Sequence, residues 1–259
     1  MRDYGRIRVT RAGGVETVTL AYPERRNAIG PRMASELLWA LEDAQASDEV
    51  RAIVLTGQGE AFCSGGDFAE MTSGGSPSTL PHKGDYADLL LALVRSDKPV
   101  VAKVNGHAMG GGLGLAAACT FAVASMQAQL GTPEIHVGLF PMMIMAVLAR
   151  HVPRRRLLEM MLLGERLSAE EAARLGLVNR VVAPGDLDIE VQRITDAVAS
   201  KSPSTVRLGL RAFAAQDDLD LEAALPMLRG RLAECLATED AREGLSALRE
   251  KRAPRWTGK

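Results

Sequence analysis

The sequence has few aromatic residues and no excess of charge of either sign. Only 4% of its 259 residues are Phe, Trp or Tyr, and the formal net charge is −1. A nearly neutral chain lacks the basic surface with which proteins bind nucleic acid or an anionic membrane, so we expect neither partner. It also has no uncharged apolar run approaching the roughly 18 residues that a membrane-spanning helix needs.

Cysteine is scarce as well. The three cysteines, Cys63, Cys119 and Cys235, are odd in number, and no two have the Cys-x-x-Cys spacing. This pattern argues against a disulfide framework and against a zinc site, and the four histidines show no spacing typical of metal ligands. Residues 1–5 hold no apolar segment typical of a signal peptide, so we expect a cytoplasmic location and no metal.

The remaining composition is that of a folded α/β protein, with 47% hydrophobic residues in a length that suits one large domain. Period-two and helical patterns alternate before residue 142 and become mostly helical after it. We expect strands at residues 6–11, 15–21, 52–55, 100–104, 121–124 and 178–182. Helices are expected near residues 31–44, 86–94, 113–119 and 168–176, and from about 186, 203, 219 and 241 onward. Residues 72–84 are expected to form a loop.

Two glycine-rich turns, each after a strand-like run, are the most informative feature. They are Phe62-Cys63-Ser64-Gly65-Gly66-Asp67 and the segment from Asn105 to Gly112, which opens an apolar helical run. Glycine leaves its backbone N–H unshielded, and a helix N-terminus adds donors without internal partners. Two such N–H groups converging on one point would stabilise an oxyanion. If the turns meet, the chain is an enzyme of carbonyl or thioester chemistry.

Glu134 is the candidate for proton transfer. It lies in the turn Gly131-Thr132-Pro133-Glu134-Ile135, followed by the apolar segment 137–145. A carboxylate among so many apolar neighbours is either an ion-paired structural group or a general acid/base with a raised pKa, and the spacing alone leaves both interpretations open.

Other reactive residues have simpler explanations. No histidine is positioned by sequence to activate Cys63, so we expect it to pack in the core. His107 could contact substrate, but holding its own loop is the favoured interpretation. Asp67 is expected to cap the turn at residues 68–71, and Arg154–Arg156 to form a solvated helix start.

A dinucleotide-binding fingerprint is the main competing motif. Gly112-x-Gly114-x-x-Ala117 follows a strand, opens a helix and has an acid, Glu134, twenty residues beyond Gly114. That acid should close the next strand, which here ends about ten residues earlier. The fingerprint also belongs in a first βα unit, so we disfavour it.

Taken together, the motifs resemble the crotonase (enoyl-CoA hydratase/isomerase) superfamily. The resemblance runs from about residue 6 to residue 252 and rests on residues 26–29, 61–67, 104–112, 132–141, 164–172 and 176–178. It implies an α/β fold with a spiral ββα core at residues 1–195, and a helical trimerisation region at residues 196–259. The expected assembly is a homotrimer or a dimer of trimers.

The resemblance also implies site residues. By position, the oxyanion-hole N–H groups belong to Gly66 and Gly111, and proton transfer belongs to Glu134. The acyl-CoA substrate would be bound by Arg25, Ala28, Ser64, Gly65, Gly66, Asp67, Phe68 and Gly111, with Lys251 reaching the CoA of a neighbouring subunit. No cofactor is implied apart from the coenzyme A of the substrate, and fatty acid metabolism is the implied setting.

One departure affects the reaction. Hydratases of the best-known type in this family hold a water between two glutamates, and the first of these positions is Gly114 here. A single carboxylate can move a proton between two carbons of an enoyl-CoA, so double-bond isomerisation fits at least as well as hydration. The alternatives are a non-catalytic acyl-CoA-binding homologue and a CoA-ester hydrolase or decarboxylase.

The sequence does not identify the acyl chain. Met71, residues 72–84 and the Met142–Met145 cluster are candidates for its pocket, because methionine adapts to many shapes. Ordinary core or interface packing of that cluster is an equally good interpretation.

Overall fold

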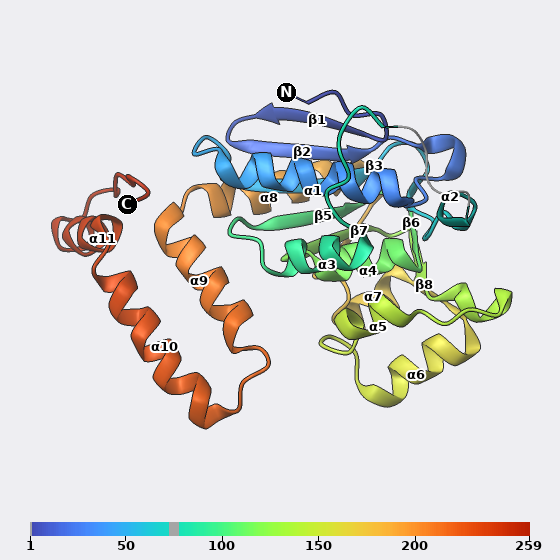
Figure 1. Cartoon of the computed structure of the whole chain (residues 1–259). Helices are drawn as coiled ribbons and strands as arrows, with labels where there is room; N and C mark the ends of the chain where they lie inside the picture. Colours follow the sequence, from blue (N-terminus) through green and yellow to red (C-terminus); the bar gives the residue numbers. More distant parts are fainter. Residues whose placement is uncertain (1, 73–77) are drawn as a thin grey trace.

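The computed structural model describes residues 2–72 and 78–259, and its centre is a six-stranded sheet in the order β1-β2-β3-β5-β7-β10 (Figure 1). The strands are β1 (Ile7–Ala12), β2 (Val15–Leu20), β3 (Ala52–Gly57), β5 (Val100–Val104), β7 (Phe121–Ser125) and β10 (Arg180–Val182). The β1–β2 pair is antiparallel across the Gly13-Gly14 turn, and the other neighbours are parallel.

A second, four-stranded sheet has the order β4-β6-β8-β9. Its strands are three residues each: β4 (Ala61–Cys63), β6 (His107–Met109), β8 (Gln129–Gly131) and β9 (Arg166–Ser168). Each of β3, β5 and β7 is followed by a short strand of this sheet, so β3–β4, β5–β6 and β7–β8 repeat as ββ units. In the sequence, β4 and β6 are recognisable only as parts of the glycine turns, because three residues are too few to show a period-two pattern.

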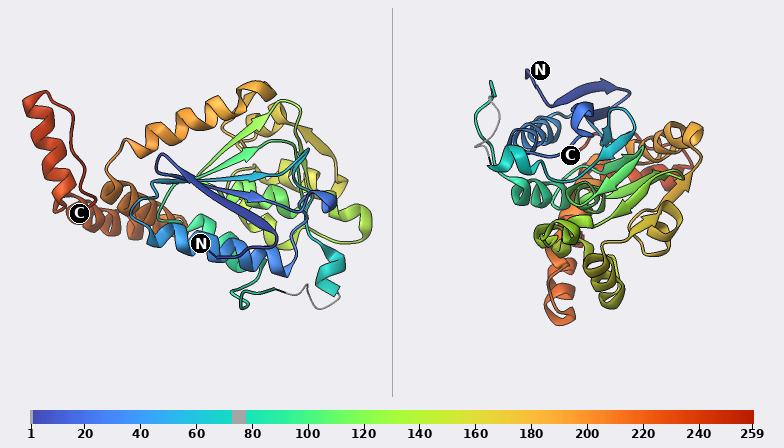
Figure 2. Two further views of the ribbon diagram at one scale, coloured as in Figure 1. Left: turned by 90° about the horizontal axis from the view of Figure 1, so that it is seen from above. Right: turned by 90° about the vertical axis from the view of Figure 1, so that its right-hand side faces the viewer.

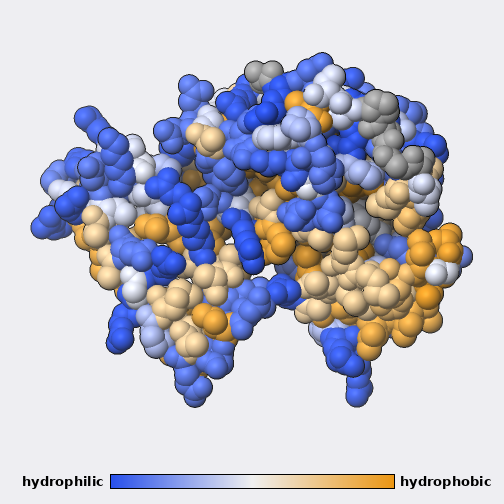
Figure 3. All heavy atoms as spheres, viewed as in Figure 1, coloured by the Kyte–Doolittle hydropathy of each residue, from blue (hydrophilic) through white to orange (hydrophobic). Residues whose placement is uncertain are grey.

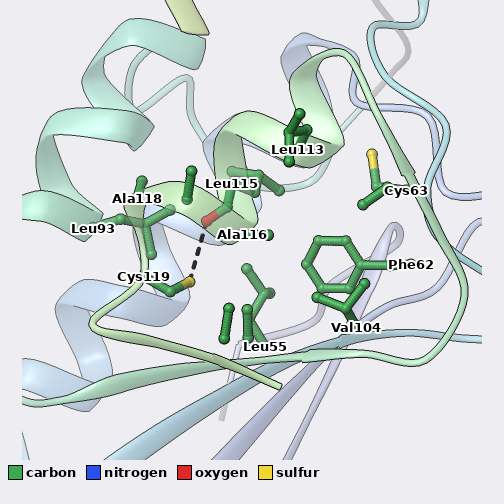
Figure 4. Packing of buried hydrophobic residues seen from close by; sticks show 14 of the residues in the cluster. Leu55, Phe62, Cys63, Leu93, Val104, Leu113, Leu115, Ala116, Ala118 and Cys119 are labelled. Atoms are coloured by element: carbon green, nitrogen blue, oxygen red, sulfur yellow. Dashed lines mark hydrogen bonds between the residues drawn. The ribbon is translucent and has the colours of Figure 1, made fainter. Parts of the chain in front are cut away.

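Helices cover both faces of the larger sheet (Figure 2). On one face pack α1 (Pro31–Ala46), α3 (Tyr86–Val94) and α4 (Gly111–Ala118), and on the other lies α8 (Leu187–Ala199). The alternation along β3 explains this, since Ile53 and Leu55 join the large core while Val54 packs with Val191 and Ile194 of α8. Figure 4 shows Phe62, Leu113 and Cys119 within the large core.

The core region also contains shorter helices and 3-10 turns. They are α2 (Phe68–Thr72), α5 (Met142–Leu148), α6 (Arg154–Leu163) and α7 (Ala169–Arg174), with 3-10 turns η1 (Pro23–Arg25), η2 (Pro133–Val137) and η3 (Pro184–Asp186). The expected Ser168–Glu171 capping box is present at the start of α7. At the start of α6, Arg154 and Arg155 are exposed, as expected for a solvated helix start.

Three helices project from the core as an arm: α9 (Pro203–Gln216), α10 (Leu221–Leu236) and α11 (Glu239–Glu250). The buried Asp240 carboxylate connects α11 to the start of α9, because it accepts hydrogen bonds from the hydroxyls of Ser202 and Ser204 at 2.7 and 2.9 Å. Those bonds, together with backbone N–H donors, lower its pKa to about 2 despite burial. No helix in the described part of the chain is long and apolar enough to cross a membrane.

The expected α/β class with a helical C-terminal region is confirmed, and every expected strand and helix has a counterpart. The expected boundary between the core and the C-terminal region, at residues 195 and 196, falls within α8 (Leu187–Ala199). The division into these two regions stays a prediction. Of the loop expected at residues 72–84, positions 73–77 lie outside the described residues.

Candidate active site

The two glycine turns meet in space. Gly65 has a φ of +106°, and a Cβ atom there would lie 3.2 Å from the carbonyl oxygen of Met109 and 3.7 Å from the amide nitrogen of Gly111. A Cβ at Gly112 would overlap the carbonyl oxygen of Cys63. Glycine is therefore needed at both positions, at Gly65 for its backbone angle and at Gly112 for the close approach.

The amide of Gly66 is left available by its backbone pairing. Gly66 forms an isolated parallel bridge with Ile29, in which the Ile29 N–H donates to Gly65 and the Asp67 N–H donates to Ile29, at 2.8 and 2.9 Å. In a parallel pairing of this kind, the N–H and C=O of Gly66, the residue between the two bonded ones, point away from Ile29. Gly66 also lines a cavity, described below, so its N–H is a candidate donor to a ligand.

The amide of Gly111 is available for a different reason. Gly111 is the first residue of α4, and the first N–H groups of a helix have no intrahelical acceptor. The positive end of the helix dipole adds to the field at this point. Gly110, the preceding residue, is fixed by a 2.8 Å hydrogen bond from its N–H to the carbonyl of Gly131, close to the Glu134 segment.

Glu134 lies in η2 beside these turns. A Cβ at Gly110 would come within 2.5 Å of the Glu134 Oε1 atom. The Oε2 atom is buried and has no hydrogen-bond partner among the residues described. Burial raises the pKa of this carboxyl above its ordinary value. No cation contributes to that shift, so the geometry favours the acid/base interpretation over the ion-paired one.

A cavity of about 270 Å³ joins all three groups. Gly66, Gly111 and Glu134 line it together with Ile29, Phe68, Met71, Tyr86, Leu139, Phe140, Pro141, Met142, Met143 and Ile144. Apart from Glu134 and Tyr86, the side chains that line the cavity are apolar. Such a wall excludes water and strengthens electrostatic interactions with a bound oxyanion.

The segment expected to bind CoA is held against the first glycine turn. Ser64 donates to the carbonyls of Arg25 and Arg26 through its hydroxyl and its N–H, at 3.1 and 3.0 Å. The fully buried Asn27 connects this segment to the core, because its side-chain amide donates to the carbonyls of Gln58 and Ala61 at 3.0 and 2.9 Å. Asn27 was not singled out in the sequence, although it lies within the matched motif.

The remaining predicted residues take simpler positions. Asp67 accepts a hydrogen bond from the Glu70 N–H at 3.1 Å, which confirms the expected cap of α2. Cys63 is buried in the core, and burial raises its pKa to about 12, so the packing interpretation is confirmed. The His107 Nδ1 atom accepts from the Gln129 N–H at 3.2 Å, and His107 does not line the cavity.

Lys251 lies far from the cavity within one chain. It is the C-cap of α11 with a φ of +56°, and α11 and α2 lie at opposite ends of the molecule in Figure 1 and in the left view of Figure 2. Its expected contact with CoA of a neighbouring subunit stays a prediction. No group of three or more His, Cys, Asp and Glu residues in the described ranges could hold a metal ion.

Tyr86 is the cavity residue that the sequence analysis missed. It is the first residue of α3, and no motif or spacing distinguishes it from the apolar residues that follow. By contrast, Met71 and the Met142–Met145 cluster were identified as candidates, and Met71, Met142, Met143 and Ile144 all line the cavity.

The chain is similar to proteins of one known family in both sequence and fold. The family model for enoyl-CoA hydratase/isomerase matches residues 10–259. The crystal structure of an enoyl-CoA hydratase from Mycobacterium smegmatis is similar, with a TM-score of 0.90 and 36% identity over 97% of this chain and 99% of that chain. The rat enoyl-CoA hydratase domain-containing protein 3, mitochondrial, is 35% identical over 94% of this chain and 82% of its own length. The short-chain-enoyl-CoA hydratase of Clostridium acetobutylicum is 31% identical over 96% of this chain and 97% of its own length.

Proposed function

The chain belongs to the enoyl-CoA hydratase/isomerase family, and we propose that it processes an enoyl-CoA through a thioester enolate. In this proposal the N–H groups of Gly66 and Gly111 bind the thioester oxygen, and Glu134 moves the proton. The observation that carries it is the shared cavity, which brings Gly66 and Gly111 together with the half-buried carboxylate of Glu134.

The two amides account for much of the catalysis. Negative charge develops on the thioester oxygen as the enolate forms, and main-chain donors already in place need no reorganisation to stabilise it. Losing one such donor typically lowers the rate by about 10²–10³, so two donors retain considerable catalytic power even with one carboxylate.

Isomerisation of the double bond is the reaction that this proposal favours. Glu134 can remove a proton from one carbon of the acyl chain and return it to another, while the amides hold the dienolate between the two steps. Hydration needs a base for the water and a proton source at the α carbon, and position 114 offers no second carboxylate for this.

A panel of unsaturated CoA esters tests the proposal. Purified protein is assayed for double-bond migration and for hydration, with α-proton exchange in D₂O as a third measurement. We expect migration and exchange to exceed hydration. Hydration faster than migration would reject the preferred reaction, and ester binding without any turnover would support a non-catalytic binder. Release of free CoA or of CO₂ would instead indicate a hydrolase or a decarboxylase.

Assembly and location complete the proposal. The apolar side chains exposed on the arm support self-association as a homotrimer or dimer of trimers, which would also bring Lys251 toward a neighbour's substrate. A cytoplasmic location rests on the sequence expectations alone.

A further inference from the structure

The space beside Gly114 is filled by two side chains. A Cβ atom at Gly114 would lie 2.5 Å from the Tyr86 hydroxyl oxygen and would overlap the Cγ2 atom of Ile144. Any side chain at this position therefore requires both Tyr86 and Ile144 to move. A tyrosine hydroxyl, rather than a carboxylate, is therefore the polar group beside residue 114.

The Tyr86 hydroxyl forms a hydrogen bond with Gly111, whose N–H is the second proposed oxyanion donor. It donates a 2.5 Å hydrogen bond to the carbonyl oxygen of Gly111. The ring lies across the same residue, since a Cβ at Gly111 would be 3.5 Å from the Tyr86 Cζ atom. Gly111 has no side chain of its own to fix its orientation, so the tyrosine restrains the first turn of α4 from outside the helix.

The chemistry of Tyr86 suits a fixed donor. Its side chain is 8% exposed, and burial raises its pKa well above the ordinary value, with smaller contributions from Cys63, Glu134 and Cys119. The phenol therefore keeps its proton at neutral pH, and that single proton is directed at Gly111. This arrangement is not that of a general acid or base.

The start of α3 sets the position of Tyr86. Asp85 caps the helix by accepting from the N–H groups of Ala87 and Asp88, at 2.8 and 3.1 Å. The Asp88 carboxylate accepts from the Asp85 N–H in return, at 2.9 Å. This capping box fixes the residue at which the helix begins, and Tyr86 is that residue.

We propose that Tyr86 is a positioning residue that holds Gly111 so that its N–H is directed at the enolate oxygen. The inference rests on the proposed function, because it assigns the alignment of one of the two oxyanion donors. Tyr86 is expected to contribute more to binding of the enolate than to binding of the neutral thioester.

The test is Tyr86→Phe in the full-length protein, with Tyr4→Phe as the matched control. The hydroxyl of Tyr4 also makes one hydrogen bond, to Asp43 at 3.4 Å, outside the cavity. We expect Y86F to lower kcat for isomerisation or α-proton exchange by about tenfold, which is the effect of losing one neutral hydrogen bond. The KM should change by less than about twofold and the acid limb of the pH profile should stay in place, since Tyr86 transfers no proton.

Ligand binding separates alignment from simple packing. Acetoacetyl-CoA can bind as its enolate, which absorbs in the ultraviolet, whereas butyryl-CoA stays neutral. We expect Y86F to reduce the bound enolate fraction and to leave butyryl-CoA affinity and Tm close to those of Y4F. Equal losses for both esters, or an unchanged kcat and enolate band, would overturn the inference. If the wild-type protein turns over no ester, the proposed function fails, and the enolate band still tests Tyr86.

Discussion

Glu134 is a carboxylate whose surroundings favour its neutral form. Burial raises its pKa, and its buried Oε2 atom has no hydrogen-bond partner in the described structure. A carboxylate that is poorly solvated is a stronger base than one in water. Glu134 is thus suited to accept a proton from a carbon acid beside the two amides.

The pH profile of the reaction should report this shift. Glu134 must be ionised to accept a proton, so kcat/KM should fall as the pH falls through its pKa. Because that pKa is raised, the acid limb should lie above the ordinary glutamate value of about 4.3. The linked contribution to stability has the opposite trend and is lost as the pH rises, since the native state binds this proton more tightly than the unfolded chain. An acid limb at the ordinary value would contradict the assignment.

Glu134→Gln tests the role of the carboxylate directly. The amide has the same shape but accepts no proton, so we expect exchange at the acyl α or γ carbon to fall by about 10²–10⁴. Binding of a saturated acyl-CoA, measured by calorimetry, should survive. Glu170→Gln, at an exposed position of α7, is the matched control. Exchange at the wild-type rate in E134Q would exclude Glu134 as the base.

The candidate site could be predicted from sequence where a local pattern is unusual, such as a glycine-rich turn after a strand or an acid among apolar residues. These patterns indicated where the site lies. The family resemblance assigned Gly66, Gly111 and Glu134, and the structure brings them to one cavity. Tyr86 was not predictable, because its contact with Gly111 joins residues far apart in the chain. Nothing local distinguishes it.

Among the elements, α3 begins at a clear local signal. Its first turn is closed by the Asp85–Asp88 capping box, and its apolar residues Leu89, Leu90 and Leu93 are buried in the core. The strands of the smaller sheet lack any such signal, since each is three residues long and is paired by the fold around it. The smaller sheet was therefore not predicted from the sequence.

Removing the N-terminal cap of α3 should slightly lower the stability of the folded protein. Asp85→Ala leaves the N–H groups of Ala87 and Asp88 without their acceptor, and we expect it to lower the free energy of unfolding by about 1 kcal/mol. Urea denaturation measures this. Asp85→Asn is the control, because asparagine caps a helix about as well. A loss of the same size in both variants would show that the charge, rather than the cap, is responsible.

At the scale of the whole molecule, exposed apolar side chains gather in two places (Figure 3). One lies near the cavity, over α3 and α5, and includes Leu91, Met142 and Met143. The other covers the arm and includes Phe213, Leu221, Leu225, Leu232 and Leu236. An arm with so many exposed apolar side chains is typical of a surface that is covered in an oligomer.

Leu232→Asp tests self-association through the arm. Leu232 is 58% exposed in the single chain, so a carboxylate there is tolerated in the monomer. Burying that charge unpaired in an interface costs several kcal/mol, and we expect the oligomer to dissociate. Sedimentation velocity measures the mass. Arg8→Glu, a charge change on an exposed position of β1, should leave the assembly intact. A monomeric wild-type protein would refute self-association.

Both proposed oxyanion donors belong to the main chain, and this has an evolutionary consequence. Point substitutions replace side chains, so they can delete or supply a carboxylate while both N–H groups persist. Descendants of one ancestral scaffold can thus acquire new reactions by exchanging the groups around a permanent thioester-activating centre. In this chain residue 114 is glycine, and Gly66 and Gly111 both line the cavity.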